Sequence, residues 1–281
     1  MTRRKFTLLA VGTGVAAVAA KFARGYDRER QANGVTYRES PSKKLDVYAP
    51  DPDGRADRPV IVYFFGGAWQ SGARTTGRDI GETLALHDMV AITPDYGIYP
   101  KSVFPGFLDD AAAAVRWARD HAKEYGGDPQ RIIVMGHSSG AHVASMIATD
   151  SRYLEAHGMS KAQLAGMVGL AGPYAAIPTT DPHMDEIFPA ALRSRALPLP
   201  FVNGDEPPML LAAGAADSDV NPRNSDEFAD ALRARHDRVE LKKYPGLGHD
   251  SMVLAFRSSE RASSPVVSDV TAFIAGCQRR A

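Results

Sequence analysis

The fold is decided by the stretch Arg131-Ile132-Ile133-Val134-Met135-Gly136-His137-Ser138-Ser139-Gly140. An apolar, β-branched run, typical of a buried strand, leads directly into a Gly-x-Ser-x-Gly pattern, and a helix-like segment from Ala141 to Thr149 follows at once. A chain that turns from strand to helix within one or two residues forces its central residue into a strained turn, which small neighbours permit. This order predicts that Ser138 stands exposed at the end of the strand as a nucleophile. The alternative is an ordinary serine in a glycine-rich turn.

Length and composition limit the number of domains and the kinds of binding site that the chain can have. The chain has 281 residues, with 33 Lys and Arg against 33 Asp and Glu, and 44% of its residues are hydrophobic. This is enough chain for one α/β domain or two small ones. The balanced charge argues against nucleic-acid binding, which needs a clustered basic excess. The single Cys277 excludes an intramolecular disulfide and a cysteine metal cluster, and no other metal or cofactor motif is present.

Residues 1–20 have the pattern of an export signal. Thr2-Arg3-Arg4-Lys5-Phe6 precedes a weakly apolar stretch and the small residues Ala17-Val18-Ala19, which are typical of a cleavage site. The paired arginines resemble a twin-arginine signal, so we expect export to the periplasm or the cell exterior. An uncleaved anchor, which would be the one membrane contact, and an incidental basic tail are the alternatives. Residues 21–43 are expected to form a linker or docking segment, and 44–281 the folded domain.

Strand-like and helix-like segments alternate through that domain. Apolar runs or alternating patterns predict strands at 45–48, 60–65, 90–94, 131–135, 164–170, 209–212 and 239–244. Helical periodicity appears at 78–87, 107–125, 141–149, 223–235 and 268–278. Such alternation predicts an α/β fold, with a mostly parallel sheet and helices on both faces. The alternation stops near 172–208, a proline-rich segment that we expect to form a short irregular cap.

A serine nucleophile needs a base within hydrogen-bond reach and a third group that orients the base. Asp217 and His249 each follow an expected strand, on loops at the same edge of the sheet. Asp219 stays open as the alternative acid, and Asp250 adjoins the base. His249 is favoured because the other histidines considered precede the acid or lie in helical or charged segments: His87, His121, His142, His157, His183 and His236.

Acyl transfer also needs donors aimed at the oxygen that develops negative charge. The loop Phe65-Gly66-Gly67-Ala68-Trp69 follows an expected central strand, and its glycines allow backbone N–H groups to face a substrate. We expect Gly67, Ala68 and Ser139, the residue after the nucleophile, to supply these donors. A plain tight turn is the alternative for the two glycines.

Taken together, these motifs resemble a bacterial α/β-hydrolase esterase of the feruloyl-esterase or acetylesterase-like kind, a neighbour of kynurenine formamidase. The resemblance extends from about Lys44 to the C-terminus. The residues on which it rests are Phe65-Gly66-Gly67-Ala68-Trp69-Gln70-Ser71-Gly72, Pro94-Asp95-Tyr96, Gly126-Gly127-Asp128-Pro129, Gly136-His137-Ser138-Ser139-Gly140, Gly214-x-x-Asp217-x-x-Val220 and Gly248-His249. The resemblance implies an α/β-hydrolase fold with an eight-stranded, mostly parallel sheet. It also implies that Asp217 is the acid.

One departure from the family pattern concerns the loop at Phe65, because these loops usually begin His-Gly-Gly. We expect Phe65 and Trp69 to make the substrate pocket more apolar. The expected function is cleavage of small carboxylic esters through an acyl-enzyme, with no cofactor and no nucleic-acid partner. An amide or formamide hydrolase of the kynurenine-formamidase type is one alternative, and a non-catalytic α/β-hydrolase binding module is the other.

Overall fold

A computed structural model describes residues 32–39, 42–177 and 182–280. The expected export signal, residues 1–20, lies outside the described residues, as does most of the expected linker. Within the described ranges no helix combines the length and the apolar character needed to cross a membrane.

A single eight-stranded sheet runs through the molecule in the order β1-β2-β4-β3-β5-β6-β7-β8. Its strands are β1 (Ala32–Arg38), β2 (Lys43–Tyr48), β3 (Arg58–Phe64), β4 (Val90–Pro94), β5 (Gly127–His137), β6 (Leu164–Leu170), β7 (Met209–Gly214) and β8 (Val239–Tyr244). β2 pairs antiparallel with β1 and with β4, and all pairs from β4 to β8 are parallel. The mostly parallel sheet expected from the sequence patterns and the eight strands implied by the family resemblance are confirmed.

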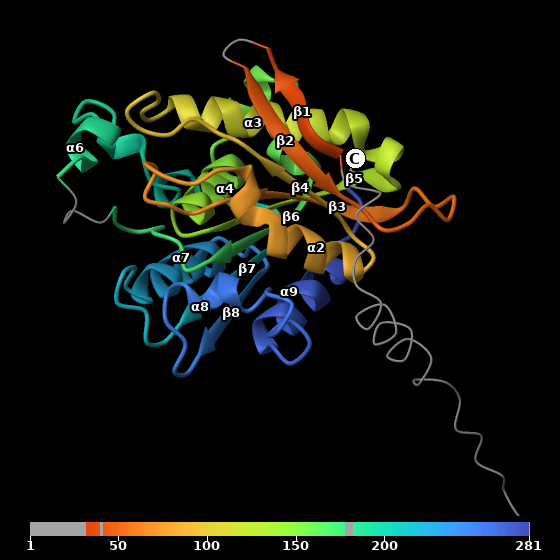
Figure 1. Cartoon of the computed structure of the whole chain (residues 1–281). Helices are drawn as coiled ribbons and strands as arrows, with labels where there is room; N and C mark the ends of the chain where they lie inside the picture. Colours follow the sequence, from red (N-terminus) through yellow and green to blue (C-terminus); the bar gives the residue numbers. More distant parts are fainter. Residues whose placement is uncertain (1–31, 40–41, 178–181, 281) are drawn as a thin grey trace, which may run out of the picture.

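Helices cover both faces of this sheet (Figure 1). The longer ones are α2 (Arg78–Leu86), α3 (Gly106–His121), α4 (Ser139–Thr149), α7 (Arg223–Ala234) and α9 (Pro265–Gly276). Because crossovers between parallel strands are right-handed, α3, α4 and α7 pack on one face, and α2 lies on the other. The C-terminal helix α9 packs against β7. The strands that this sandwich encloses, β3 to β7, are apolar almost throughout and buried.

The folded domain begins earlier than residue 44, because strand β1 takes up residues 32–38 of the segment 21–43 that was expected to be a linker or docking segment. Strand β1 extends the sheet beyond β2, and its side chains are mostly half-buried. Arg38 at its end bonds the carboxylates of Asp109 and Asp110 on α3, at 2.7 and 2.8 Å. These polar contacts, together with the packing of Ala32, Val35 and Tyr37 against the core, hold the edge strand to the fold.

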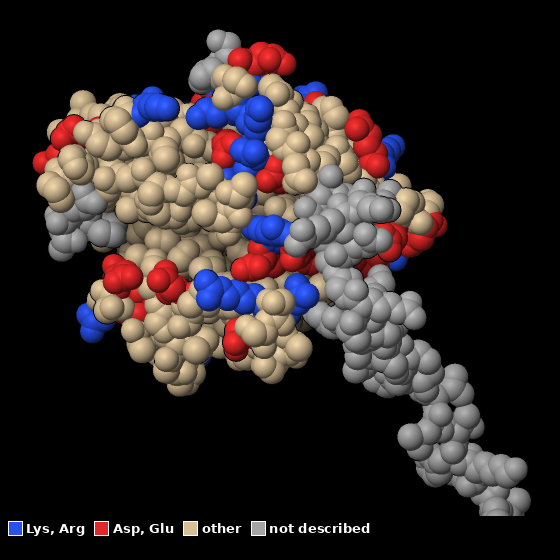
Figure 2. Space-filling model, in the orientation of Figure 1, with Lys and Arg blue, Asp and Glu red and all other residues tan. Residues whose placement is uncertain are grey.

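The described part of the segment 172–208 is irregular, as expected of a cap. It contains the short helix α6 (Met184–Ile187) and two 3-10 turns, at Arg193–Arg195 and Leu199–Phe201. Two further short helices that the sequence analysis did not predict are α5 (Ser151–Ala156) and α8 (Ser251–Leu254). On the face shown in Figure 2, basic and acidic side chains are interleaved, in keeping with the balanced charge of the chain.

Candidate active site

Ser138 occupies a strained turn between β5 and α4. Its backbone has φ 54° and ψ −124°, a conformation that residues other than glycine rarely adopt. A Cβ at Gly136 would lie 2.1 Å from the carbonyl oxygen of Gly140, and one at Gly140 would lie 2.1 Å from that of Phe64. The Ser138 N–H donates to the Leu170 carbonyl on β6 at 2.9 Å. Both glycines are therefore required for the turn, which supports the strand–turn–helix geometry expected from the sequence.

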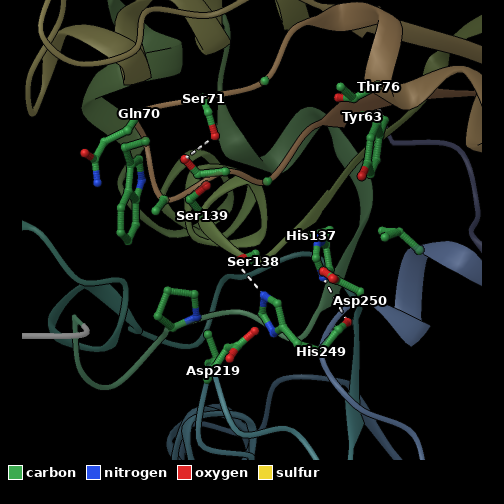
Figure 3. Close-up of a pocket in the computed structure, with 18 of the residues that line it drawn as sticks. Tyr63, Gln70, Ser71, Thr76, His137, Ser138, Ser139, Asp219, His249 and Asp250 are labelled. Carbon is green, nitrogen blue, oxygen red and sulfur yellow. Dashed lines mark hydrogen bonds between the residues drawn. The ribbon is translucent and has the colours of Figure 1, made fainter. Parts of the chain in front are cut away.

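Two loops from neighbouring strands bring a base and an acid to this serine. His249 follows β8, and its Nε2 lies 2.8 Å from Ser138 Oγ. Its Nδ1 lies 2.8 Å from Oδ2 of Asp217, which follows β7. The side chains are largely shielded from solvent, with 11% of His249 and 1% of Asp217 exposed. The sequence predicts these three residues as nucleophile, base and acid, and the fold brings them together in one hydrogen-bonded row. Figure 3 shows the contact between His249 and Ser138.

Asp217, and not Asp219, contacts the histidine. The second carboxylate oxygen of Asp217 accepts the backbone N–H groups of Asp219 and Val220, both at 2.9 Å. These two bonds fix the carboxylate so that its other oxygen faces His249. Asp219 thus contributes its backbone to the arrangement, while its own side chain is exposed at the edge of the cavity.

The sequence analysis gave no role to His137, which precedes the nucleophile. Its Nε2 lies 3.2 Å from the His249 carbonyl oxygen, and the two imidazole rings lie 4.7 Å apart between centroids. Burial, with a smaller effect of the His249 charge, lowers the pKa of His137 to about 4. A neutral His137 donates Nε2–H to that carbonyl and so supports the loop that carries His249. Only the position between Gly136 and Ser138 could have indicated this contact.

The loop after β3 is strained where the oxyanion donors are expected. Gly67, Ala68 and Trp69 have positive φ angles of 130°, 52° and 59°. Carbonyl oxygens along the loop are occupied, since Gly67 O accepts from Ser71 N at 3.0 Å and Phe65 O accepts from the Tyr96 hydroxyl at 2.6 Å. Within the described part of the chain, the N–H groups of Gly67 and Ala68 donate to no protein acceptor. Both residues line the same cavity as Ser138 and Ser139.

This cavity has a volume of about 840 Å³ and opens beside Ser138. Trp69 lines it, as expected, with its ring edge-on to Phe188 of the cap at 4.8 Å and to His142 of α4 at 5.2 Å. Phe65 does not line it, which corrects that expectation: its ring is buried and stacks on Tyr96 at 4.3 Å. The chain turns sharply after β3, so Phe65 points into the core while Trp69 faces the cap.

The middle and N-terminal part of the domain matches a known family model. Residues 45–181, from β2 into the cap, match the model described as BD-FAE. This range includes the loop after β3 and the Ser138 turn, and it ends before Asp217 and His249.

Relatives and solved structures extend the likeness over most of the described chain. A probable isoprenylcysteine alpha-carbonyl methylesterase from Arabidopsis thaliana is 29% identical over 78% of this chain and 57% of its own length. The esterase LipC from Mycobacterium tuberculosis is 28% identical over 76% of this chain and 58% of its own length. The solved structure of a butyrate-bound esterase from Thermogutta terrifontis has a TM-score of 0.71 and 28% identity, over 87% of this chain and 93% of that one.

These likenesses confirm the α/β-hydrolase fold and the resemblance to esterases of that fold. The chain spans little more than half the length of the curated relatives that it matches over most of its own length.

Proposed function

We propose that the protein is a serine hydrolase that cleaves small carboxylic esters through an acyl-enzyme. The observation that carries this proposal is the hydrogen-bonded row from Asp217 through His249 to Ser138, with 2.8 Å at each contact, beside an open cavity. A base within reach of a hydroxyl, held by a buried acid, is the arrangement that makes serine a nucleophile at neutral pH. The esterase names of the relatives and of the solved structure support the same chemistry.

In the first half of the reaction, Ser138 Oγ attacks the ester carbonyl carbon and gives its proton to His249 Nε2. The tetrahedral intermediate collapses as the bond to the leaving alcohol breaks, and His249 returns the proton to the departing oxygen. The acyl group is now on Ser138. Throughout, Asp217 accepts the Nδ1–H hydrogen bond, which fixes the ring orientation and stabilises the imidazolium while it exists.

In the second half, water replaces the alcohol. His249 takes a proton from the water as its oxygen attacks the acyl carbon, and Ser138 Oγ leaves and regains that proton. Backbone N–H groups of Gly67, Ala68 and Ser139 are the proposed donors to the carbonyl oxygen in both tetrahedral intermediates. Their support is the strained loop geometry, the unoccupied donors of Gly67 and Ala68, and the place of Ser139 at the start of α4, where an N–H has no partner within the helix.

The cavity favours a small substrate. About 840 Å³ lies in the range of pockets for small molecules, and the described part of the cap holds only short helical turns. We propose that small, neutral acyl groups are preferred and that no cofactor takes part.

The test is a substrate panel with p-nitrophenyl esters from acetyl to dodecanoyl, together with N-formylkynurenine. We expect kcat/KM to fall from acetyl or butyryl toward the long chains, and Ser138→Ala to abolish hydrolysis. A preference for N-formylkynurenine over every ester would favour the amide-hydrolase alternative. No hydrolysis and no covalent labelling by a fluorophosphonate would favour the binding-module alternative.

We further propose that the protein is exported by the twin-arginine route. The support is in the sequence alone, in Arg3-Arg4, the weakly apolar stretch after them and Ala17-Val18-Ala19. Replacing Arg3 and Arg4 by Lys should leave unprocessed protein in the cytoplasm. Wild-type protein that fractionates with the cytoplasm and keeps its N-terminus would contradict this proposal.

A further inference from the structure

Two carboxylates beside His249 are not used by the proposed mechanism. Asp219 and Asp250 both line the cavity, and both are exposed to solvent. In the described chain neither side chain takes part in an ion pair or a hydrogen bond, whereas Asp217 between them is fully engaged. Figure 3 shows Asp219 on one side of the His249 ring and Asp250 on the other.

The cavity offers no basic side chain to balance these carboxylates. None of the described residues that line it is Lys or Arg, and its two histidines are His137, which is held neutral, and His249 itself. Unpaired carboxylates in a cleft give it a negative potential, which attracts cations and repels anions. The charge of the site is therefore opposite to what an anionic substrate requires.

Tyr63 brings a further polar group to the same end of the cavity. Tyr63 on β3 lines the cavity, and only 3% of the residue is exposed. In the described chain its hydroxyl has no hydrogen-bond partner. In Figure 3 this hydroxyl points toward the side of the cavity that holds His137 and Asp250. A phenol hydroxyl aimed there can accept a hydrogen bond from a bound group or donate one to it.

The positions of Asp219 and Asp250 show which part of an ester substrate lies beside them. His249 must deliver its proton to the leaving oxygen, so the alcohol part of an ester lies on the His249 side. The proposed oxyanion donors, Gly67 and Ala68, lie on a different loop, after β3. Asp219 and Asp250 flank His249 and so adjoin the alcohol part. We propose that these two carboxylates select esters whose leaving alcohol carries a positive charge. This proposal rests on the proposed ester hydrolysis.

The test compares esters that differ in charge alone. Acetylcholine and 3,3-dimethylbutyl acetate have the same shape, with a quaternary nitrogen in one and carbon in the other, and the acetate ester of 3-hydroxypropanesulfonate carries the opposite charge. A pH-stat measures kcat/KM for each at one pH. Because the carboxylates are exposed, we expect a preference of roughly three- to tenfold for acetylcholine over the neutral ester, and a similar preference for the neutral ester over the anionic one.

Variants assign that preference to the two carboxylates. Asp219→Asn and Asp250→Asn should each lower the ratio of the two kcat/KM values, for acetylcholine over 3,3-dimethylbutyl acetate, about two- to threefold, and the double variant should bring it near one. A general effect of either change on catalysis by His249 would alter both kcat/KM values together and leave the ratio as it was. Asp51→Asn removes an equal charge from an exposed residue that does not line the cavity, and it should keep the wild-type ratio.

A second measurement needs no variant, because added salt screens exposed charges. The ratio of the wild-type protein should decline toward one as ionic strength rises. The proposed charge selection would be overturned by a wild-type ratio at or below one, or by a double variant that keeps the wild-type ratio of kcat/KM for acetylcholine over 3,3-dimethylbutyl acetate. The proposed ester hydrolysis would not be affected by either result. Failure of the wild-type protein to hydrolyse any of the three esters would instead overturn the proposed function and this inference with it.

Discussion

Strands β7 and β8 carry acidic and basic side chains at both ends, and the two ends differ in what these groups can do. At the carboxyl ends, Asp217 follows β7 and His249 follows β8. At the amino ends, Glu206 precedes β7 and Asp237 precedes β8, and Lys161 precedes the adjacent strand β6. Both ends place a base beside a buried carboxylate at 2.8 Å. Only the carboxyl end adds a serine and an open cavity.

The group at the amino ends, which we name the Lys161 cluster, consists of Lys161, Asn203, Asp205, Glu206 and Asp237. Lys161 Nζ bonds Glu206 Oε1 at 2.8 Å, Asn203 Oδ1 at 3.0 Å and the Thr149 carbonyl oxygen at 3.2 Å, and it pairs with Asp205. Only 5% of the Lys161 side chain and none of Glu206 is exposed. Burial opposes the charge on Lys161, but hydrogen bonds to Asp205 and Glu206 raise its pKa above the usual value.

The difference teaches that a close acid–base contact is not by itself a catalytic site. Four oxygens of the protein occupy the donors of Lys161, so its ammonium group is not available to a substrate. The Lys161 cluster instead joins α4, β6 and the chain before β7. His249 has one nitrogen on an acid and the other on a hydroxyl that faces a cavity, so it can both take and return a proton. Changes at the carboxyl ends should therefore alter rate, and changes at the amino ends should alter stability.

The largest effect is expected for Ser138→Ala. Loss of the nucleophile removes the covalent route, so kcat for p-nitrophenyl acetate should fall on the order of 10⁴-fold or more. The unfolding temperature should stay close to that of the wild type, because the change removes only a hydroxyl that faces the cavity. Near-normal turnover by folded Ser138→Ala protein would remove Ser138 from the mechanism.

Asp217→Asn should come next, with a loss of about 10³- to 10⁴-fold in kcat, because an amide stabilises the wrong tautomer of His249. Asp219→Asn is the matched control two residues away. It keeps the backbone N–H that supports Asp217 and should cost less than about tenfold on a neutral ester. If Asp219→Asn proved the more damaging of the two, the assignment of the acid would be wrong.

Lys161→Met should act on stability. Removing the cation leaves Glu206 charged and buried, which costs about 3–5 kcal/mol of unfolding free energy. Chemical denaturation measures this loss, while kcat of the folded fraction should stay within about twofold of the wild type. Lys123→Met, at an exposed position, serves as the control and should change stability by less than about 0.5 kcal/mol. A large loss of kcat with unchanged stability would contradict the distinction between the two ends.

The smallest effect is a pH dependence of stability. Burial, with the hydrogen bond and charge of Glu206, raises the pKa of Asp237 to about 7. Between about pH 4 and pH 7 the folded protein therefore keeps a proton on Asp237 that the unfolded chain, in which the pKa is near 4, has already released. The stabilisation from this carboxyl is complete below about pH 4 and is lost as the pH rises through about 7.

Asp237→Asn should accordingly reduce the decline in unfolding temperature between about pH 5 and pH 8. Thermal unfolding followed by circular dichroism at each pH measures this, with Asp51→Asn as a charge-matched control. An identical decline in wild type and Asp237→Asn would remove Asp237 as its source.

Much of the carboxyl-end site could be predicted from the sequence because its parts follow strands directly. The apolar run before Gly136, the loop position of Asp217 and the glycines before His249 each place a side chain at one edge of the sheet. The orientation of Phe65 could not be predicted, because the alternation of a strand ends where the turn begins.

The Lys161 cluster and strand β1 were missed for a related reason. Lys161 is a single charged residue before a strand, and its side-chain partners come from 42 to 45 residues further along the chain. β1 is an edge strand with mostly half-buried side chains, so its sequence lacks the apolar pattern by which strands are found. The polar contacts of the Lys161 cluster and of Arg38 at the end of β1 join residues that are distant in sequence, and local patterns carry no sign of them.

Activation of Ser138 by His249 is the central step of the proposed mechanism, and the rate of covalent labelling tests this step most directly. A fluorophosphonate should add once to the wild-type protein, with intact mass and peptide mapping placing the adduct on Ser138. In His249→Ala the labelling rate should fall at least about 100-fold, since a general base contributes 10²- to 10⁴-fold. In Ser138→Ala no adduct should form. An adduct on another residue, or labelling of Ser138 at the same rate without His249, would contradict the proposed active site.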